Sequence, residues 1–194
     1  FPGIDAEFAE ASDFFLSEAN EDTIATILVD LSCGSGFMSR KFVKSGRYGQ
    51  VISADLSPNM LTETRRRFIE EGLTPSLLVR ADSAKLPFDS NSIDFLHAGA
   101  AMHCWPRLDM ALSEVHRVLK PGGKFYASTF FRTFGTPTKP INAMTSRPAS
   151  TSGMYMFESN EEIVKLLTEA GFNGGGGMVR REGRGCAIVK AVKD

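Results

Sequence analysis

Residues 28–37 read Leu-Val-Asp-Leu-Ser-Cys-Gly-Ser-Gly-Phe, and this stretch decides the fold. An apolar run with β-branched members, residues 26–31, predicts a buried strand. The small residues after it predict a tight loop, and apolar residues at helical spacing resume from Phe37 to about Val43. Small residues let the backbone approach a ligand closely, and a helix N-terminus offers unpaired N–H groups. The stretch therefore predicts a strand, a loop suited to a ligand, and a helix.

The rest of the chain repeats this alternation of apolar strands and amphipathic helices. Further helices are predicted at residues 4–19, 58–71, 108–119 and 161–170, and further strands at 51–54, 77–79, 93–98, 124–131 and 185–192. Pro121-Gly122-Gly123 predicts the end of a helix and a turn before the next strand. Continuously apolar strands are typical of a mostly parallel sheet covered on both faces. The sequence therefore predicts an α/β fold with a doubly wound sheet.

Composition narrows the class of protein. The chain has 194 residues, 42% of them hydrophobic, and balances 22 Lys and Arg against 23 Asp and Glu. This length predicts one soluble, folded domain, and near-neutrality gives no electrostatic reason to expect nucleic acid. No apolar stretch approaches the roughly 18 residues that a membrane span needs. Cys33, Cys104 and Cys186 are odd in number and form no CxxC pattern, so neither a disulfide framework nor a zinc site is predicted, and a reducing, intracellular compartment is expected.

Two sequence patterns place such a glycine loop against a ligand. Dinucleotide enzymes need GxGxxG, but Ser39 stands where the third glycine should be, which disfavours an NAD(P)-dependent oxidoreductase. The second pattern is an acidic residue at the strand end followed by a small-residue loop. Asp30 fits that pattern, because it can orient the loop or reach the charged amino group of a ligand. An ordinary strand–helix turn is the alternative that carries no function.

Acidic residues also follow the next two strands. Asp55 ends the strand at 51–54, about 20 residues past the loop, where a carboxylate can accept hydrogen bonds from both hydroxyls of a ribose. The alternative role for Asp55 is a helix N-cap, for which Ser57 before Pro58 is the better candidate. Asp82 follows the strand at 77–79 and, taken alone, is typical of a turn.

Together these residues resemble the class I S-adenosylmethionine-dependent methyltransferases. The first motif of that family reads roughly hydrophobic-hydrophobic-Asp-x-Gly-x-Gly-x-Gly; here Ser32 replaces the first glycine, which is tolerable where φ stays negative. Later motifs match in order, at residues 57–61, 80–88, 119–125 and 166–172. The resemblance covers about residues 26–172. It implies a Rossmann-like, seven-stranded, mostly parallel sheet in a single domain over residues 1–194.

The resemblance implies that S-adenosylmethionine binds at these motifs and leaves as S-adenosylhomocysteine. In the family, an acidic residue at the position of Asp82 bonds the adenine amino group, and the next residue, here Ser83, supplies a backbone N–H. Leu56 is a candidate to cover one face of the base. The expected cofactor-binding residues are Asp30, Ser32, Cys33, Gly34, Gly36, Asp55, Leu56, Asp82, Ser83 and Ala98. Cys33 is interpreted as a small buried hydrophobe, not a nucleophile.

The loop after the strand at 93–98 would line the space between the cofactor and a methyl acceptor. Residues 97–106, His-Ala-Gly-Ala-Ala-Met-His-Cys-Trp-Pro, resemble plastid-targeted methyltransferase-like proteins of plants and algae, in the subgroup of ubiquinone/menaquinone methyltransferases. Ser32 also agrees with that branch. His103 is the candidate base, with a pocket-lining or hydrogen-bonded role as the alternative. Trp105 and Tyr155 are candidate substrate contacts, and His97 is expected in the core or as a residue that supports the site without contacting the ligand.

The implied reaction is in-line displacement of a methyl group onto a small-molecule acceptor, whose identity the sequence does not assign. Residues 132–157 are too long for an ordinary connection and are expected to form a substrate lid. A methyltransferase-like module that binds the cofactor without turnover is the competing hypothesis. The chain begins at Phe1, and the resemblance implies that a plastid transit segment preceded it. Nothing indicates the oligomeric state.

Overall fold

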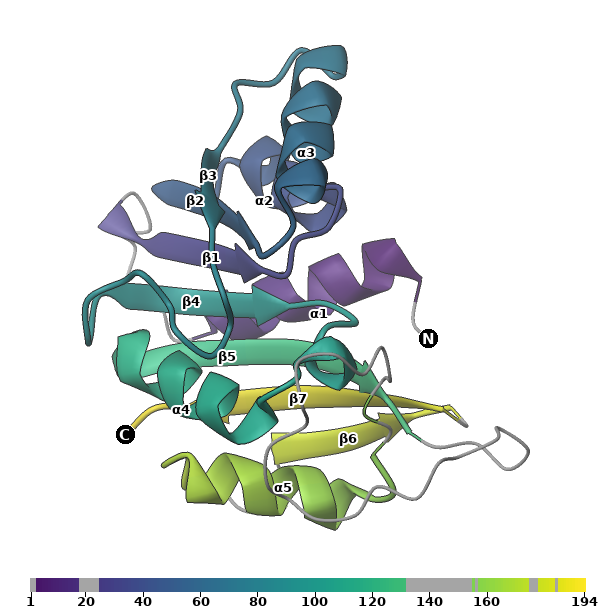
Figure 1. The fold of residues 1–194 in the computed structure, drawn as a ribbon, viewed down its shortest axis with the longest axis vertical. Coiled ribbons are helices and arrows are strands. Elements are labelled where there is room, and N and C mark those ends of the chain that lie inside the picture. The colour runs from purple at the N-terminus through teal and green to yellow at the C-terminus, as the bar shows by residue number, and fades with distance from the viewer. Residues whose placement is uncertain (1–2, 18–24, 132–154, 156, 175–177, 184) are drawn as a thin grey trace.

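The computed structural model describes residues 3–17, 25–131, 155, 157–174, 178–183 and 185–194. In these parts of the chain, seven strands form one sheet in the order β3-β2-β1-β4-β5-β7-β6 (Figure 1). The strands are β1 (Ile27–Leu31), β2 (Gln50–Asp55), β3 (Leu77–Arg80), β4 (Ile93–Ala98), β5 (Leu119–Phe130), β6 (Val179–Glu182) and β7 (Cys186–Val192).

Strands β1 to β5 are parallel, and β7 pairs antiparallel with both β5 and β6. The chain moves outward from β1 through β2 to β3, and then returns to the other side of β1 with β4. In an open parallel sheet, ligands bind at the carboxyl ends of the strands on either side of such a reversal. The fold therefore places a ligand site beyond the ends of β1, β2 and β4.

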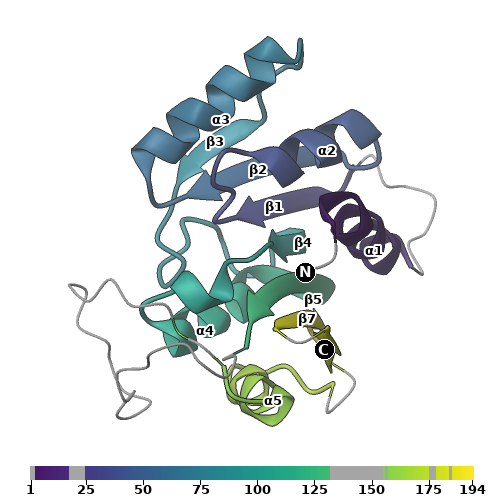
Figure 2. The same ribbon diagram turned by 90° about the vertical axis from the view of Figure 1, so that its right-hand side faces the viewer.

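Helices cover both faces of the sheet, and Figure 2 shows α1 and α2 on one face and α4 and α5 on the other. The helices are α1 (Ile4–Leu16), α2 (Phe37–Ser45), α3 (Pro58–Glu70), α4 (Leu108–Val118) and α5 (Asn160–Glu169), with a short 3₁₀ helix, η2 (Met102–Cys104). Ser57 caps α3 by accepting the amide of Met60, as its position before Pro58 predicted. The predicted doubly wound, mostly parallel α/β sheet is confirmed.

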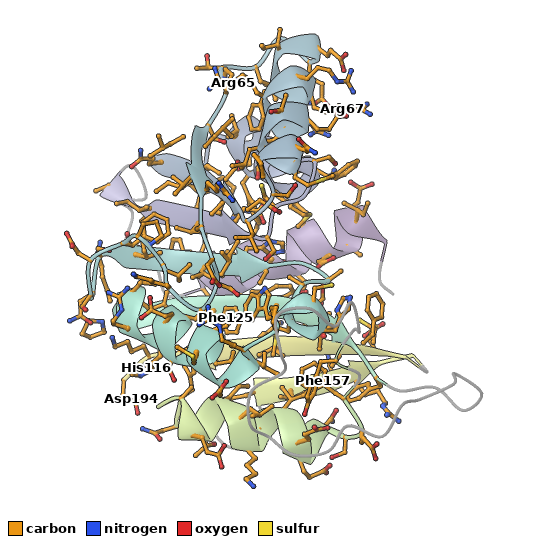
Figure 3. All side chains as sticks on the ribbon, in the orientation of Figure 1. Arg65, Arg67, His116, Phe125, Phe157 and Asp194 are labelled. Atoms are coloured by element: carbon orange, nitrogen blue, oxygen red, sulfur yellow. The ribbon has the colours of Figure 1, made fainter. Side chains whose placement is uncertain are left out.

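Aromatic side chains dominate the packing under α1 and α2. Phe15 of α1 and Phe42 of α2 are fully buried, and Phe15 stacks on Phe95 with ring centroids 5.2 Å apart. On the other face, Phe125 of β5 lies behind α4, and its ring centroid is 6.1 Å from that of Phe172 (Figure 3). Burial of this much apolar surface on each face holds the strand ends in fixed positions.

Strand β6 was not among the strands with a predicted range, and two element boundaries differ from prediction by more than two residues. Strand β5 begins at Leu119, so Pro121-Gly122-Gly123 lie in a bulge inside the strand and not in a turn before it. The pairing with β4 jumps from Ile93–Leu119 to Phe95–Lys124, and the left-handed φ of +76° at Gly122 accommodates the extra residues. Helix α1 ends at Leu16, short of the predicted end, because the next residue has extended backbone angles.

Candidate functional site

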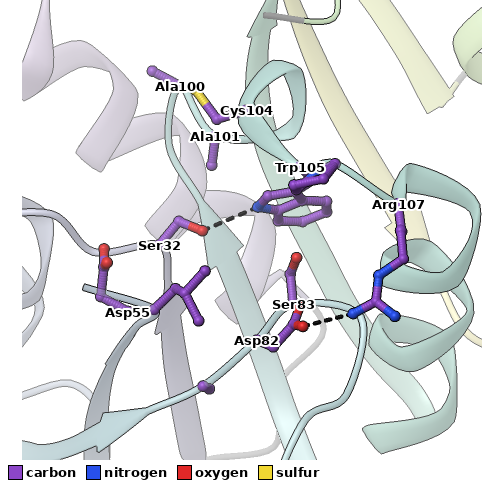
Figure 4. A pocket seen from close by; sticks show the side chains of 12 residues that line it. Ser32, Asp55, Asp82, Ser83, Ala100, Ala101, Cys104, Trp105 and Arg107 are labelled. Atoms are coloured by element: carbon purple, nitrogen blue, oxygen red, sulfur yellow. Dashed lines mark hydrogen bonds and ion pairs between the residues drawn. The ribbon is translucent and has the colours of Figure 1, made fainter. Parts of the chain in front are cut away.

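A cavity of about 730 Å³ opens at the carboxyl ends of β1, β2, β3 and β4 (Figure 4). Its volume lies within the range of about 300–1,000 Å³ that is typical of small-molecule sites. Asp55 is the last residue of β2, and the other lining residues lie in the segments that follow β1 to β4. The lining consists of Ser32, Asp55, Leu56, Ala81, Asp82, Ser83, Ala100, Ala101, Cys104, Trp105, Pro106 and Arg107. The site therefore lies where the reversal of strand order predicts it.

Six residues predicted from the sequence line this cavity: Ser32, Asp55, Leu56, Asp82, Ser83 and Trp105. Seven others do not belong to its lining: Asp30, Cys33, Gly34, Gly36, Ala98, His103 and Tyr155. Sequence reasoning missed the remaining lining residues, of which Arg107 is the only charged one. Only their position in the sequence could have indicated them, because each lies within two positions of a predicted residue along the chain.

The carboxylate of Asp55 is held in place from two directions. Its Oδ2 accepts the backbone N–H of Gly34 at 2.9 Å, and its Oδ1 accepts that of Ser57, also at 2.9 Å. The side chain thus joins the loop after β1 to the start of α3. Each carboxylate oxygen has a second lone pair, so a ligand with two neighbouring hydroxyls could still donate to Asp55.

The glycine loop packs against α3 through Thr64. Gly36 has a left-handed φ of +71°, and a Cβ there would lie 2.4 Å from Cγ2 of Thr64. The Thr64 hydroxyl donates to the carbonyl of Gly34 at 2.8 Å. Burial raises the pKa of the Cys33 thiol, and the negative charges of Asp30 and Asp55 raise it further, so this thiol stays protonated at neutral pH. Close packing against α3 therefore shapes the loop, and its glycines and Cys33 do not belong to the cavity lining.

Ser32 has a φ of +59°, so the expectation of a negative φ at this position is wrong. The left-handed conformation is the one that a glycine, usual here in the family, adopts without strain. The serine hydroxyl accepts the indole N–H of Trp105 at 3.0 Å, as the dashed line in Figure 4 shows. This hydrogen bond offsets part of the strain and fixes the ring of Trp105 in the cavity wall.

Asp82 forms an ion pair that the sequence did not predict. Its Oδ2 accepts from Nη2 of Arg107 at 2.6 Å, and its Oδ1 accepts the backbone N–H of Ala84 at 2.9 Å (Figure 4). The two charged side chains are 40% and 42% exposed, so their pairing contributes little to stability. Its effect is geometric, since it orients the carboxylate at one end of the cavity and places a guanidinium beside it.

Asp30 does not face the cavity. Its side chain is buried on the α1–α2 face of the sheet, where Oδ2 accepts the Ser39 hydroxyl at 2.5 Å and Oδ1 lies 2.8 Å from Nδ1 of His97. Neither contact is with the cavity or with the loop at residues 32–36, because Ser39 belongs to α2 and His97 to β4, so Asp30 joins β1 to these two elements. The physical reason is strand alternation, because successive side chains of β1 point to opposite faces of the sheet.

His97 is fully buried between two carboxylates from different elements. Besides Asp30 of β1, Oε1 of Glu7 in α1 lies 3.8 Å from Nε2 of His97. Burial acts to lower the pKa of His97, but the hydrogen bond to Asp30 and the charges of Asp30 and Glu7 outweigh it and raise the pKa to about 9. A cationic imidazole at neutral pH therefore links α1 to β1 and β4 in the core, where His97 was expected.

The buried cation makes stability depend on pH. Because the folded pKa of about 9 exceeds the ordinary value of 6.5, protonated His97 stabilises the fold fully below about pH 6.5, and this contribution is lost as the pH rises through 9. Urea-unfolding midpoints measured from pH 6 to 10 are expected to fall more steeply for the wild type than for His97→Gln, which cannot titrate. Parallel pH profiles for the two proteins would contradict a buried cation at this position.

His103 and Tyr155 lie next to each other, beside β5. The ring of His103 is buried, packs edge-on against Phe130 and has Nδ1 3.4 Å from the Thr129 hydroxyl. The amide of Tyr155 donates to the carbonyl of His103 at 2.6 Å, and the Tyr155 hydroxyl donates to Glu162. Burial lowers the pKa of His103, so the ring is neutral near pH 7. Contact of either residue with a substrate stays a prediction, and the expected lid lies outside the described residues apart from Tyr155 and Phe157.

The arrangement at the cavity defines the class of protein. Ser32 of the small-residue loop after β1, Asp55 at the end of β2 and Asp82 after β3 line one cavity, an arrangement that the resemblance to class I S-adenosylmethionine-dependent methyltransferases implied. Residues 29–127 match the family described as methyltransferase domain. The chain belongs to this methyltransferase family, and the cofactor of its class is S-adenosylmethionine.

Comparison with known proteins places the chain within the family. An uncharacterized chloroplastic methyltransferase of Arabidopsis thaliana is 41% identical over 88% of this chain and 47% of its own length. A ubiquinone/menaquinone biosynthesis C-methyltransferase of Laribacter hongkongensis is 31% identical over 75% of this chain and 66% of its own length. The chain thus spans about half to two thirds of these relatives.

A solved structure shares the fold. An S-adenosylmethionine-dependent methyltransferase from Aquifex aeolicus superposes with a TM-score of 0.68 at 20% identity, covering 87% of this chain and 82% of the other. At this identity the likeness bears on the fold alone, and it agrees with the strand order described above. Within the described residues, no helix is long and apolar enough to cross a membrane.

Proposed function

We propose that this domain transfers a methyl group from S-adenosylmethionine to a small-molecule acceptor. The observation that carries the proposal is the cavity of about 730 Å³, with Asp55 at the end of β2 and Asp82 just after β3, in a chain of the methyltransferase family. Nearly balanced charge and a concave site both favour a small molecule over nucleic acid as the acceptor.

The lining residues fit the chemistry of S-adenosylmethionine. Asp55 would accept hydrogen bonds from the ribose, and Asp82 would accept from the adenine amino group while the amide of Ser83 donates to the ring. Leu56 leaves 56% of its surface exposed beside them, which suits an apolar side chain that covers a base when the site is filled. When bound, the cofactor supplies a methyl group activated by a positively charged sulfonium.

The protein's own contribution to transfer is to exclude water and to align the acceptor. Trp105 and the small residues Ala100 and Ala101 form an apolar part of the cavity wall, which would keep water away from the acceptor. His103 is the proposed base for an acceptor that must lose a proton, because its lowered pKa keeps the ring neutral and able to accept one. Trp105 and Tyr155 are the proposed substrate contacts. The relative from Laribacter hongkongensis is named as a C-methyltransferase of quinone biosynthesis, which supports a small organic acceptor here.

The test is transfer of a labelled methyl group from S-adenosylmethionine to a panel of small organic acceptors, quinols and phenols included. We expect transfer to at least one acceptor. His103→Ala is expected to lower turnover by about 100-fold or more, as loss of a general base does, while the affinity for S-adenosylhomocysteine stays nearly unchanged. Equal loss of turnover and affinity would mark His103 as structural. Cofactor binding without transfer to any acceptor would support the competing hypothesis of a binding module.

We also propose a plastid location for the protein that contains this domain. The support is the chloroplastic relative, which matches 88% of the chain. The experiment is subcellular fractionation of the source organism with an antibody raised against this domain. Enrichment with plastid markers is expected, and enrichment with cytosolic markers would contradict the proposal.

A further inference from the structure

The turn after β4 forms one side of the cavity and holds a strained residue. Ala100 has a φ of +48°, in the left-handed region that is unfavourable for a residue with a Cβ, and it lines the cavity together with Ala101. A conformation of this kind persists only where surrounding contacts determine it.

Ser128 of β5 binds both amides of the turn. Its hydroxyl oxygen accepts the N–H of Ala100 at 2.7 Å, and its carbonyl accepts the N–H of Ala101 at 3.3 Å. The Ser128 hydroxyl in turn donates its own proton to Oε1 of Glu7 at 2.6 Å. Ser128 is fully buried, and its hydrogen bond to Glu7 is buried with it, whereas the bond to Ala100 is partly buried beside the cavity.

Glu7 reaches this position from the N-terminal helix α1. Its carboxylate is 2% exposed and lies against the turn, since a Cβ on Gly99 would be 3.3 Å from Oε1 of Glu7 and 2.8 Å from Cε1 of His97. Burying a carboxylate is costly unless it is hydrogen-bonded and paired, and here Ser128 and the cationic His97 meet both needs. One buried side chain of α1 therefore touches the elements that shape the cavity wall.

We infer that Glu7 and Ser128 are positioning residues for the methyltransferase cavity: Glu7 orients the Ser128 hydroxyl, and that hydroxyl holds Ala100 in its left-handed conformation. Helix α1 thus influences the affinity for the ligand through Glu7, although none of its described residues lines the cavity. The inference rests on the proposed use of this cavity for S-adenosylmethionine. It predicts that breaking the chain of hydrogen bonds weakens ligand binding at a distance.

The test compares two buried serines on the same face of the sheet. Ser128→Ala is expected to weaken S-adenosylhomocysteine binding, measured by calorimetry, by roughly 3- to 10-fold, as expected for one lost hydrogen bond. Ser53→Ala removes an equally buried hydroxyl of β2 that pairs with Ser76 at 2.5 Å and does not line the cavity. This control is expected to bind like the wild type. Wild-type affinity in Ser128→Ala, or equal weakening in Ser53→Ala, would overturn the inference.

If Ser128→Ala does not fold, a second pair of variants tests whether the hydrogen bond between Glu7 and Ser128 affects ligand binding. Glu7→Ala removes the acceptor of the Ser128 proton, whereas Glu7→Gln retains an oxygen that can accept it. We expect Glu7→Ala to weaken S-adenosylhomocysteine binding and Glu7→Gln to recover most of the lost affinity. Equal affinities for the two variants would overturn the inference. Absence of binding by the wild type would instead contradict the proposed function.

Discussion

Gly36→Ala is expected to lower the free energy of unfolding by about 2–5 kcal/mol. The left-handed φ of +71° costs a residue with a Cβ about 1–2 kcal/mol. The new Cβ would also lie 2.4 Å from Cγ2 of Thr64, and such overpacking costs about 1–3 kcal/mol more. Urea unfolding, followed by circular dichroism, measures the change.

Gly34→Ala is the matched control for this prediction. Gly34 has a similar φ of +56°, but a Cβ there meets nothing within 4 Å, so only the backbone cost of about 1–2 kcal/mol is expected. The double variant Gly36→Ala with Thr64→Ser removes the methyl group in the way and should recover part of the loss. Equal destabilisation by Gly34→Ala and Gly36→Ala would show that contact with α3 does not select glycine at position 36.

Asp55→Ala is expected to weaken S-adenosylmethionine binding by about 1–3 kcal/mol, roughly 5- to 150-fold. The variant loses the carboxylate proposed to accept from the ribose. It also releases the amide of Gly34 and that of Ser57, so the loop and α3 are no longer joined beside the cavity. The measurement is calorimetric titration with S-adenosylhomocysteine, which has the same ribose and cannot transfer a methyl group. Its affinity is expected to fall by the same factor.

Asp94 offers a matched control for Asp55. It is the second residue of β4, at the opposite end of this strand from the cavity, and its carboxylate accepts the amide of Ile27 at 2.8 Å and pairs with Lys120 at 2.7 Å. Asp94→Ala therefore removes a comparable anchor and is expected to lower stability without changing the affinity for the cofactor. Unchanged affinity in Asp55→Ala would contradict the assignment of Asp55 to the ribose. Equal weakening by both variants would show that the loss of affinity comes from lower stability and not from a lost contact with the ribose.

The parts of the site that the sequence predicted follow from one geometric rule. Parallel strands end at the same edge of a sheet, so residues just after the ends of successive strands are brought together. Asp55 and Asp82 are 27 positions apart along the chain and meet at one cavity for this reason. The α/β class and the order of every α-helix and strand except β6 were equally accessible, because apolar runs and helical spacing are local features of the sequence.

The parts that the sequence did not predict depend on contacts between distant segments. The pairing of Asp30 with His97 requires the register of β1 against β4, which periodicity does not specify. A lone arginine in a loop has no distinguishing pattern, so the ion pair of Arg107 with Asp82 could be seen only in three dimensions. The left-handed backbone of Ser32 was missed because serine rarely adopts it without a partner such as Trp105.

The hydrogen bond between Trp105 and Ser32 has a spectroscopic consequence. Trp105 is the single tryptophan among the 194 residues, and its indole lies in the cavity wall, only 3% exposed. All intrinsic tryptophan fluorescence of this chain therefore originates beside the cavity, and a purine that enters it changes the surroundings of the emitting ring. The protein contains its own optical reporter, with which ligand occupancy can be followed in solution without any label.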